Sequence, residues 1–199
     1  MAPASLIHLG DVHLTVALAS AVTIWLLVAD SRESARYWVI AVSGAFGVVA
    51  VSKIMYLGWG TQFLLLGFKA ISGHAAGATA VLPMVLYLLA NFLGRRAQGI
   101  ALVGGWVISA AVAAALVRHG EHTVSEALAG WCLGALASGA TCRHVRYKTV
   151  HPSLPAFGTT LAVTVIVAAC MQNVPVGWWM IKTALVLSGD GRIHNWNDC

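Results

Sequence analysis

Long apolar segments and short polar connections alternate along the whole chain. Six of the apolar segments approach the roughly 20 residues that a helix needs to cross a bilayer. The predicted helices are Val12–Ala29, Tyr37–Leu57, Ser72–Leu93, Gly99–Val117, Thr123–Ala140 and Ala156–Val174. The pattern therefore predicts an all-α protein, a polytopic membrane helix bundle with about six transmembrane helices.

The composition favours the same class of protein. Of the 199 residues, 59% are hydrophobic and only 10% are charged, and the mean hydropathy is +0.79. Soluble domains are about half apolar and a quarter charged. The length suits one domain, residues 1–199, rather than two. No Lys or Arg precedes the first apolar segment, so we expect a retained helix there rather than a cleaved signal peptide.

The net charge of +5 does not indicate a nucleic-acid partner, because the basic residues lie in short loops between apolar segments. The four cysteines lack the spacing of metal ligands, so we expect neither a zinc site nor a disulfide. Membrane lipids are the expected partners, and no cofactor or metal is expected.

Short connections make successive helices antiparallel, and this brings distant polar residues to one end of the bundle. The end of the second helix, the start of the third, the end of the fourth and the start of the fifth share a membrane face. The residues brought together there are Lys53, His74, Arg118, His122 and Glu126.

The basic residues also predict an orientation. Seven of the twelve Lys and Arg lie in loops at the opposite end of the bundle, and five lie at the end that carries the histidines. The seven are Arg32, Arg36, Arg95, Arg96, Arg143, Arg146 and Lys148. Because cytoplasmic loops carry the excess of Lys and Arg, we expect the histidine end on the non-cytoplasmic side. The expected location is a bacterial inner membrane, with the site facing the periplasm.

The polar residues at this end suit phosphoryl chemistry. His122 and Glu126 are four residues apart at a helix start, so their side chains can meet. A carboxylate beside an imidazole fixes its tautomer and raises its basicity. His74 starts another helix after Ser72 and Gly73, and Lys53 adds positive charge. One imidazole can then attack phosphorus while the other protonates the leaving oxygen.

These residues resemble the membrane-bound type 2 phosphatidic acid phosphatases. That family carries the motifs K-x6-R-P, P-S-G-H and S-R-x5-H-x3-D. Here the corresponding residues are Lys53, Ser72-Gly73-His74 and His122-x3-Glu126. The chain departs from these motifs at several positions. Ile71 replaces Pro, Gly60-Thr61 replaces Arg-Pro, Leu116 replaces the third motif's Arg, and Glu126 replaces Asp.

The resemblance implies a role for each matching residue. His122 is the expected nucleophile, forming a phosphohistidine, His74 the general acid, and Glu126 the residue that orients His122. The residues implied in phosphate binding are Lys53, Ser72, Gly73 and, as a substitute for the missing arginine, Arg118. The implied activity is metal-independent hydrolysis of a lipid phosphate or diphosphate, such as phosphatidic acid, phosphatidylglycerol phosphate or a polyprenyl diphosphate.

Simpler structural interpretations compete with several of these roles. Thr123 and Glu126 also fit a capping box at a helix start, and Ser72 fits a helix N-cap. Lys53 could extend to the membrane interface, and Arg118 could be an interfacial residue.

Three other functions compete with the phosphatase. The chain could bind lipid head groups without turnover or transfer phosphate between lipids, as the missing arginines suggest. A serine hydrolase using Ser72 is less favoured, because the acid paired with His122 suits phosphoryl chemistry. A metal site at His119 and His122 has the wrong spacing.

Overall fold

The computed structural model describes residues 4–29, 31–145, 154–189 and 191–194. These residues form an all-α structure with seven α-helices. The α-helices are α1 (Val12–Val28), α2 (Arg32–Trp59), α3 (Gly73–Leu89), α4 (Arg95–Arg118), α5 (Val124–Val145), α6 (Leu154–Met171) and α7 (Val176–Ser188). Three short 3-10 helices join them: η1 (Ala4–Gly10), η2 (Leu64–Leu66) and η3 (Ala90–Leu93).

Several of these helices are long and apolar enough to cross a membrane. By length and composition they are α2, α4, and α3 together with its extension η3. A bent pair, α6 and α7, meets at 56° and makes a fourth span if it is counted as one. These helices indicate an integral membrane protein. The three or four spans are fewer than the six predicted, because α1 is a shorter apolar helix and α5 does not qualify.

Several helices extend beyond their predicted boundaries into the polar connections. The helix α2 begins at Arg32 instead of Tyr37, and α4 begins at Arg95, so the turn predicted at residues 94–98 is mostly helix. Arg143, predicted in a loop, lies in the last turn of α5. Hydropathy marks where a helix leaves the bilayer, whereas Arg, Glu and Ala continue a helix into water. Arg146 and Lys148 of the same predicted loop lie outside the described residues.

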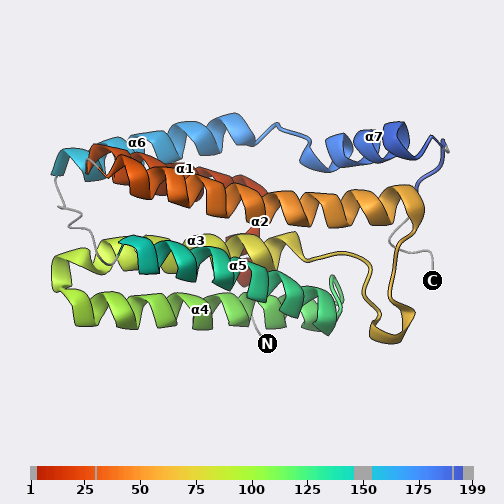
Figure 1. Cartoon of the computed structure of the whole chain (residues 1–199), viewed down its shortest axis with the longest axis horizontal. Coiled ribbons are helices and arrows are strands. Elements are labelled where there is room, and N and C mark those ends of the chain that lie inside the picture. Colours follow the sequence, from red (N-terminus) through yellow and green to blue (C-terminus); the bar gives the residue numbers. More distant parts are fainter. Residues whose placement is uncertain (1–3, 30, 146–153, 190, 195–199) are drawn as a thin grey trace.

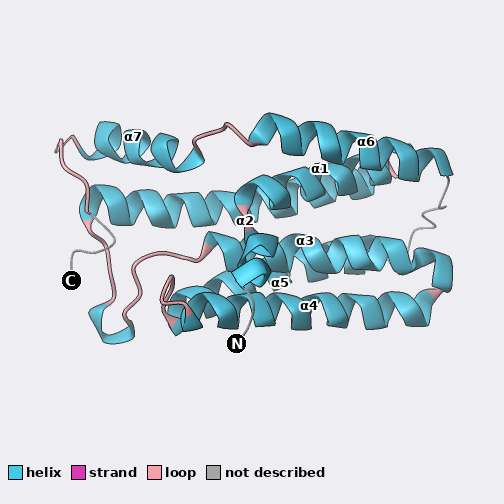
Figure 2. Ribbon diagram, turned by 180° about the vertical axis from the view of Figure 1, so that it is seen from behind, coloured by secondary structure: helices cyan, strands magenta, loops and turns pink. Residues whose placement is uncertain are grey.

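The helices lie side by side along the long axis of the molecule (Figure 1). Both views show α3, α4 and α5 as neighbours in one half and α1, α2 and α6 in the other (Figures 1 and 2). The helix α3 packs on α5 and α4, while α2 bridges the halves through α5. The start of α3, the end of α4 and the start of α5 therefore lie at one end of the bundle, as predicted.

Close packing of α3 against α5 fixes the relative position of their N-terminal ends. A Cβ atom added to Gly130 would lie 2.5 Å from the Ser72 carbonyl oxygen, and one on Gly134 would lie 2.4 Å from that of Ala76. These distances are too short for any side chain, so the backbones touch. The sequence Gly130-x3-Gly134 predicts a small-residue packing face, and the structure confirms it.

Candidate functional site

The Glu126 carboxylate is the centre of the hydrogen-bonded group at this end of the bundle. One oxygen, Oε1, accepts hydrogen bonds from the backbone N–H groups of Lys69 (2.9 Å) and Ala70 (3.4 Å). The other, Oε2, accepts from the N–H of Thr123 (3.1 Å) and lies 2.9 Å from Nδ1 of His122. Only 4% of Glu126 is exposed. A buried carboxylate is tolerated when it is hydrogen-bonded on both oxygens, as it is here.

The structure confirms the capping box at Glu126, and the same carboxylate also contacts His122. The Thr123 hydroxyl accepts a hydrogen bond from the Glu126 N–H at 3.4 Å, while the Glu126 carboxylate accepts one from the Thr123 N–H. This is the reciprocal geometry of a capping box. The same oxygen, Oε2, also contacts His122. Glu126 therefore starts α5 and orients the imidazole at once.

The contact with Glu126 indicates which tautomer a neutral His122 ring adopts. An ionised carboxylate can only accept hydrogen bonds, so Nδ1 of His122 is the donor. The neutral imidazole then carries its lone pair on Nε2, the nitrogen that points away from Glu126. The side chain of His122 is 12% exposed, so its surroundings are largely desolvated. In this arrangement Nε2 is the nitrogen that can act as a nucleophile or base.

Ser72 starts α3 and joins it to α5. Its hydroxyl accepts a hydrogen bond from the Ala75 N–H at 3.4 Å, which confirms the N-cap interpretation. Its own N–H donates to the Glu126 carbonyl oxygen at 3.2 Å, and the residue is fully buried. The preceding Ile71 N–H donates to the Ser52 hydroxyl at 3.1 Å. Hydrogen bonds thus hold the segment that precedes His74 to both α2 and α5.

Lys53 reaches this group from α2. Its Nζ lies 3.6 Å from the point where a Cβ atom on Gly73 would be. It acts electrostatically on Glu126 and on His74, and His74 in turn interacts with His122. The structure thus brings together Lys53 of α2, His74 of α3 and the pair formed by Glu126 of α5 and His122 in the turn before it. The first-turn N–H groups of α3, beside Gly73, complete a positive environment.

Arg118 is placed differently from the other predicted residues. It is exposed at the C-terminal end of α4. It lines an apolar groove of about 530 Å³ between α4 and α5, together with residues such as Val124 and Trp131. Its predicted contact with phosphate stays a prediction.

The sequence analysis missed a contribution from the N-terminal segment. A Cβ atom on Gly10 would lie 2.6 Å from the His74 carbonyl oxygen, so η1 packs directly on the start of α3. Asp11 follows, and its charge acts on His74. Partial burial opposes ionisation of Asp11, but hydrogen bonds from the N–H and ring of His13 outweigh it and lower the pKa of Asp11. An Asp just before an apolar helix signals an N-cap, but nothing local to it predicts the proximity to His74.

Comparisons with known proteins agree with the motifs. Residues 55–150 match the family model described as the PAP2 superfamily, a range that includes His74, His122 and Glu126. A protein of Klebsiella pneumoniae, described as an uncharacterized 22.5 kDa protein in cps region, is 33% identical over 128 residues. The alignment covers 62% of this chain and 61% of that relative, so the chain spans about three fifths of the relative's length. No solved structure matches.

Proposed function

From the PAP2 superfamily domain that the chain carries at residues 55–150, we infer a phosphatase, and we propose that its substrate is a lipid phosphate or diphosphate. Phosphatidic acid, phosphatidylglycerol phosphate and polyprenyl diphosphates are the candidate substrates. The superfamily consists generally of metal-independent phosphatases, so the proposed hydrolysis needs no metal ion.

The contact of 2.9 Å between His122 Nδ1 and the Glu126 carboxylate carries this proposal. It supports His122 as the nucleophile, because the proton on Nδ1 leaves a lone pair on Nε2. The Glu126 carboxylate also accepts hydrogen bonds from the backbone N–H groups of Lys69 and Ala70, which lie just before Ser72. The same carboxylate therefore supports the proposed nucleophile and the segment that leads to His74. A catalytic group is efficient only when its geometry is fixed before the reaction.

In the proposed first step, Nε2 of His122 attacks the phosphorus atom and an N–P bond forms. The P–O bond to the lipid alcohol breaks, or the P–O bond to the lipid phosphate in a diphosphate. His74 donates its proton to the leaving oxygen. Lys53 and the first N–H groups of α3 stabilise the charge on the phosphoryl oxygens.

In the proposed second step, water attacks the phosphohistidine. The water molecule gives a proton to His74, the N–P bond breaks and inorganic phosphate leaves. His122 returns with a free Nε2, and His74 returns protonated. The proton that left with the lipid in the first step is thus replaced from water, and both histidines end in their starting states.

The surroundings of the site support a lipid substrate. The loop between α2 and α3 exposes an apolar segment, in which Leu64 is 79% and Leu65 is 102% exposed. This loop is joined to the site, since the Ser125 hydroxyl donates to the Leu66 carbonyl oxygen at 2.9 Å. An apolar loop beside a site at the end of a membrane bundle suits contact with lipid.

We also propose six membrane crossings for the bundle. They are α1 to α5 and the bent pair of α6 and α7, with the His122 end on the non-cytoplasmic side. The asymmetry of Lys and Arg supports this orientation.

One alternative function has a specific observation in its favour. At two positions the family has an arginine, and this chain has a residue without a charged side chain to bind phosphate. Leu116 is fully buried. Gly60 has a φ of +64°, and a Cβ atom there would lie 2.9 Å from the His194 ring. A site with fewer phosphate contacts could bind a lipid head group without cleaving it.

Phosphate release from the three candidate lipids by the purified protein, in detergent with EDTA, tests both functions. The expected result is release by the wild type and a loss on the order of 10³-fold in His122→Ala, because the nucleophile is gone. His119→Ala is the matched control, since His119 is exposed nearby, and it should keep its activity. Phosphohistidine is stable in base and labile in acid, so base-stable, acid-labile phosphorylation should appear in the wild type and in His119→Ala but not in His122→Ala.

Three results would each contradict one part of this proposal. Activity that persists in His122→Ala excludes the proposed nucleophile. Activity that disappears with EDTA contradicts a metal-independent reaction. Binding of the lipids without phosphate release identifies the head-group-binding alternative.

A further inference from the structure

A second cavity lies at the opposite end of the bundle from His122. Its volume is about 540 Å³, and residues of α3, α4 and α5 line it. We call it the arginine pocket and define it by Tyr87, Arg95, Gly99, Leu102, Trp106 and Arg143. Tyr87 follows His74 by 13 positions on α3, which corresponds to about 20 Å along the helix. The arginine pocket is therefore separate from the candidate catalytic site.

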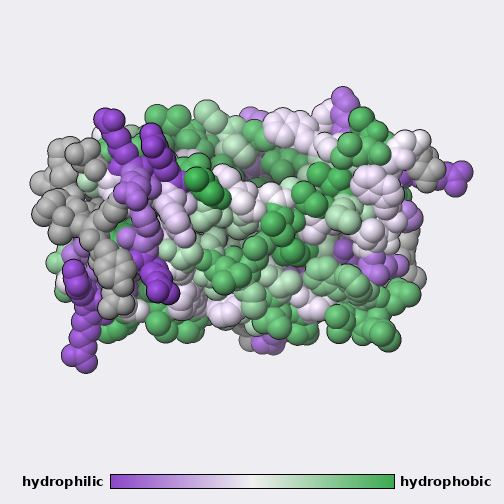
Figure 3. Space-filling view, in the orientation of Figure 1, coloured by the Kyte–Doolittle hydropathy of each residue, from purple (hydrophilic) through white to green (hydrophobic). Residues whose placement is uncertain are grey.

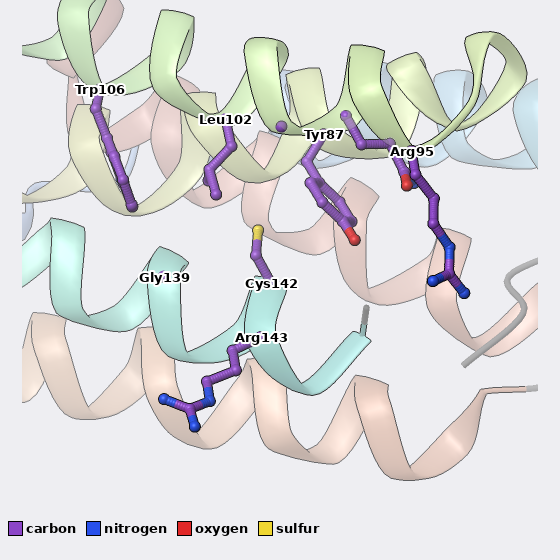
Figure 4. A pocket seen from close by; sticks show the side chains of 9 residues that line it. Tyr87, Arg95, Leu102, Trp106, Gly139, Cys142 and Arg143 are labelled. Atoms are coloured by element: carbon purple, nitrogen blue, oxygen red, sulfur yellow. The ribbon is translucent and has the colours of Figure 1, made fainter. Parts of the chain in front are cut away.

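Two arginines flank the arginine pocket. Arg95 reaches from α4 toward α5, and Arg143 lies on α5 with its guanidinium group turned away from Arg95 (Figure 4). Both are exposed. Among the residues that the structure describes, neither forms an ion pair. Two positive charges beside one cavity, without a described acidic partner, favour an anionic ligand.

The start of α4 adds hydrogen-bond donors at the same place. Its N-cap is Gly94, which provides no side-chain hydrogen bond. In the part of the chain that the structure describes, no N-cap side chain bonds the first N–H groups of α4, and such groups bind phosphate well. Figure 3 shows hydrophilic residues gathered at this end of the molecule and hydrophobic residues over its middle. The charged rim therefore lies near the expected membrane surface.

The wall of the arginine pocket becomes apolar along α4. Leu102 and Trp106 follow Arg95 by 7 and 11 positions on one face of the helix, about 10 and 16 Å deeper into the bundle. The Trp106 Nε1–H donates to the Ser138 hydroxyl at 3.1 Å, which fixes the ring. The Cys142 sulfur points into the same space (Figure 4). A charged rim above an apolar wall matches an amphiphile with an anionic head.

We propose that the arginine pocket binds a phosphate-bearing anion. An anionic phospholipid would fill the whole pocket, with its head group at the charged rim and an acyl chain along the apolar wall. The phosphate lies at Arg95 and the start of α4, Arg143 adds positive charge to the rim from α5, and an acyl chain lies along Leu102 and Trp106. Basic pockets between membrane helices bind such head groups. The same rim could hold free phosphate, which lacks the chain. This inference does not depend on the proposed phosphatase activity.

Binding of phosphatidylglycerol to the purified protein, counted by native mass spectrometry, tests the proposal. This lipid is a phosphodiester, so the proposed hydrolysis does not consume it. The double variant Arg95→Gln/Arg143→Gln should bind it about tenfold more weakly, because charge-assisted hydrogen bonds are lost. The control Arg32→Gln/Arg36→Gln removes the same charge from exposed positions of α2 outside the pocket, and should bind as the wild type does.

A second variant tests the cavity without changing charge. Gly99 lines the arginine pocket, and a Cβ atom there meets no atom within 4 Å. Gly99→Leu should therefore fold normally, fill the apolar part and weaken lipid binding about fivefold or more. Gly104→Leu is the matched control, because Gly104 has equal space on α4 and does not line the pocket.

Titration with inorganic phosphate distinguishes the two sources of the anion. If millimolar phosphate displaces the lipid, the ligand of the arginine pocket is phosphate itself. If lipid binding resists phosphate, the ligand is the whole phospholipid. Equal lipid binding by the wild type, the arginine double variant and Gly99→Leu overturns the proposal. That result would leave the phosphatase untouched, since the catalytic assay uses a different site and different residues.

Discussion

A single carboxylate performs three tasks at the candidate catalytic site. Glu126 closes the capping box with Thr123, contacts Nδ1 of His122, and accepts the N–H groups of Lys69 and Ala70. Four hydrogen-bond partners face its two oxygens, so the buried carboxylate is fully hydrogen-bonded. Removing the Glu126 side chain would therefore disturb both the local structure and the proposed chemistry, so its effects on stability and on catalysis need separate measurements.

The variant Glu126→Gln tests the charge and keeps nearly the same shape. The amide has only one acceptor oxygen, so its nitrogen faces N–H donors that the carboxylate accepted. We expect kcat to fall by about 10²–10⁴-fold, because the imidazole loses its charged support. Unfolding in detergent should become easier by about 1–3 kcal/mol. Lipid phosphate hydrolysis and thermal unfolding measure the two effects.

Glu126→Asp is the comparison for the same position. It keeps the charge but shortens the reach by one methylene, so we expect partial activity between the wild type and Glu126→Gln. If Glu126→Gln loses stability but hydrolyses the lipid as fast as the wild type, Glu126 is only a capping residue and does not support His122 in the reaction.

The sequence predicts part of this site and misses another part for a physical reason. The pair His122 and Glu126, and the capping box with Thr123, follow from spacing within one helix turn. The contact of Glu126 with Lys69 joins residues 57 positions apart, so local spacing cannot reveal it. The contribution of Asp11 to His74 is likewise a product of chain packing. Antiparallel helices predict the shared end, but only the structure shows which side chains meet.

At the scale of the helices, the packing of α3 on α5 holds the two halves of the site together. Gly130 lies against Ser72, next to His74, and Gly134 lies against Ala76 one turn further along. A sequence motif of two glycines four apart predicts close packing without naming the partner. Helix ends were less predictable, as at Arg32 and Arg95, because polar residues continue a helix beyond the apolar segment.

The variant Gly134→Ala tests this packing. Its methyl group would lie 2.4 Å from the Ala76 carbonyl oxygen, so α3 and α5 must separate. Overpacking of this kind costs about 1–3 kcal/mol, and the shift should lower kcat as well, because His74 moves relative to His122. Thermal unfolding and lipid phosphate hydrolysis in detergent measure both.

Gly104→Ala provides the matched control, since a Cβ atom on Gly104 meets no atom within 4 Å. It should leave hydrolysis unchanged and raise helix stability by about 0.5–1 kcal/mol. Equal thermal stability of Gly134→Ala and the wild type would contradict close packing of the two helices at this point.

At the scale of the molecule, the two ends of the bundle differ in chemistry. One end carries His74, His122 and Glu126, and the other carries the arginine pocket with Arg95 and Arg143. The hydropathy pattern predicts the membrane class and the all-α fold. The number of crossings is harder to predict, because α6 and α7 bend by 56° where one predicted helix was expected to end. Length and hydropathy do not say whether such a pair crosses once.

The proposed orientation places the two ends on opposite sides of the membrane, and cysteine labelling tests it. Gln62 is an exposed polar residue at the His122 end, and Arg96 is exposed at the other end. In a variant without native cysteines, Gln62→Cys should react with a membrane-impermeant maleimide in intact cells. Arg96→Cys should react only after lysis, because positive loops stay in the cytoplasm. The reverse pattern would place the site in the cytoplasm, and labelling of both positions in intact cells would contradict any crossing between them. The experiment thus separates the orientation, which rests on seven basic residues against five, from the chemistry of His122.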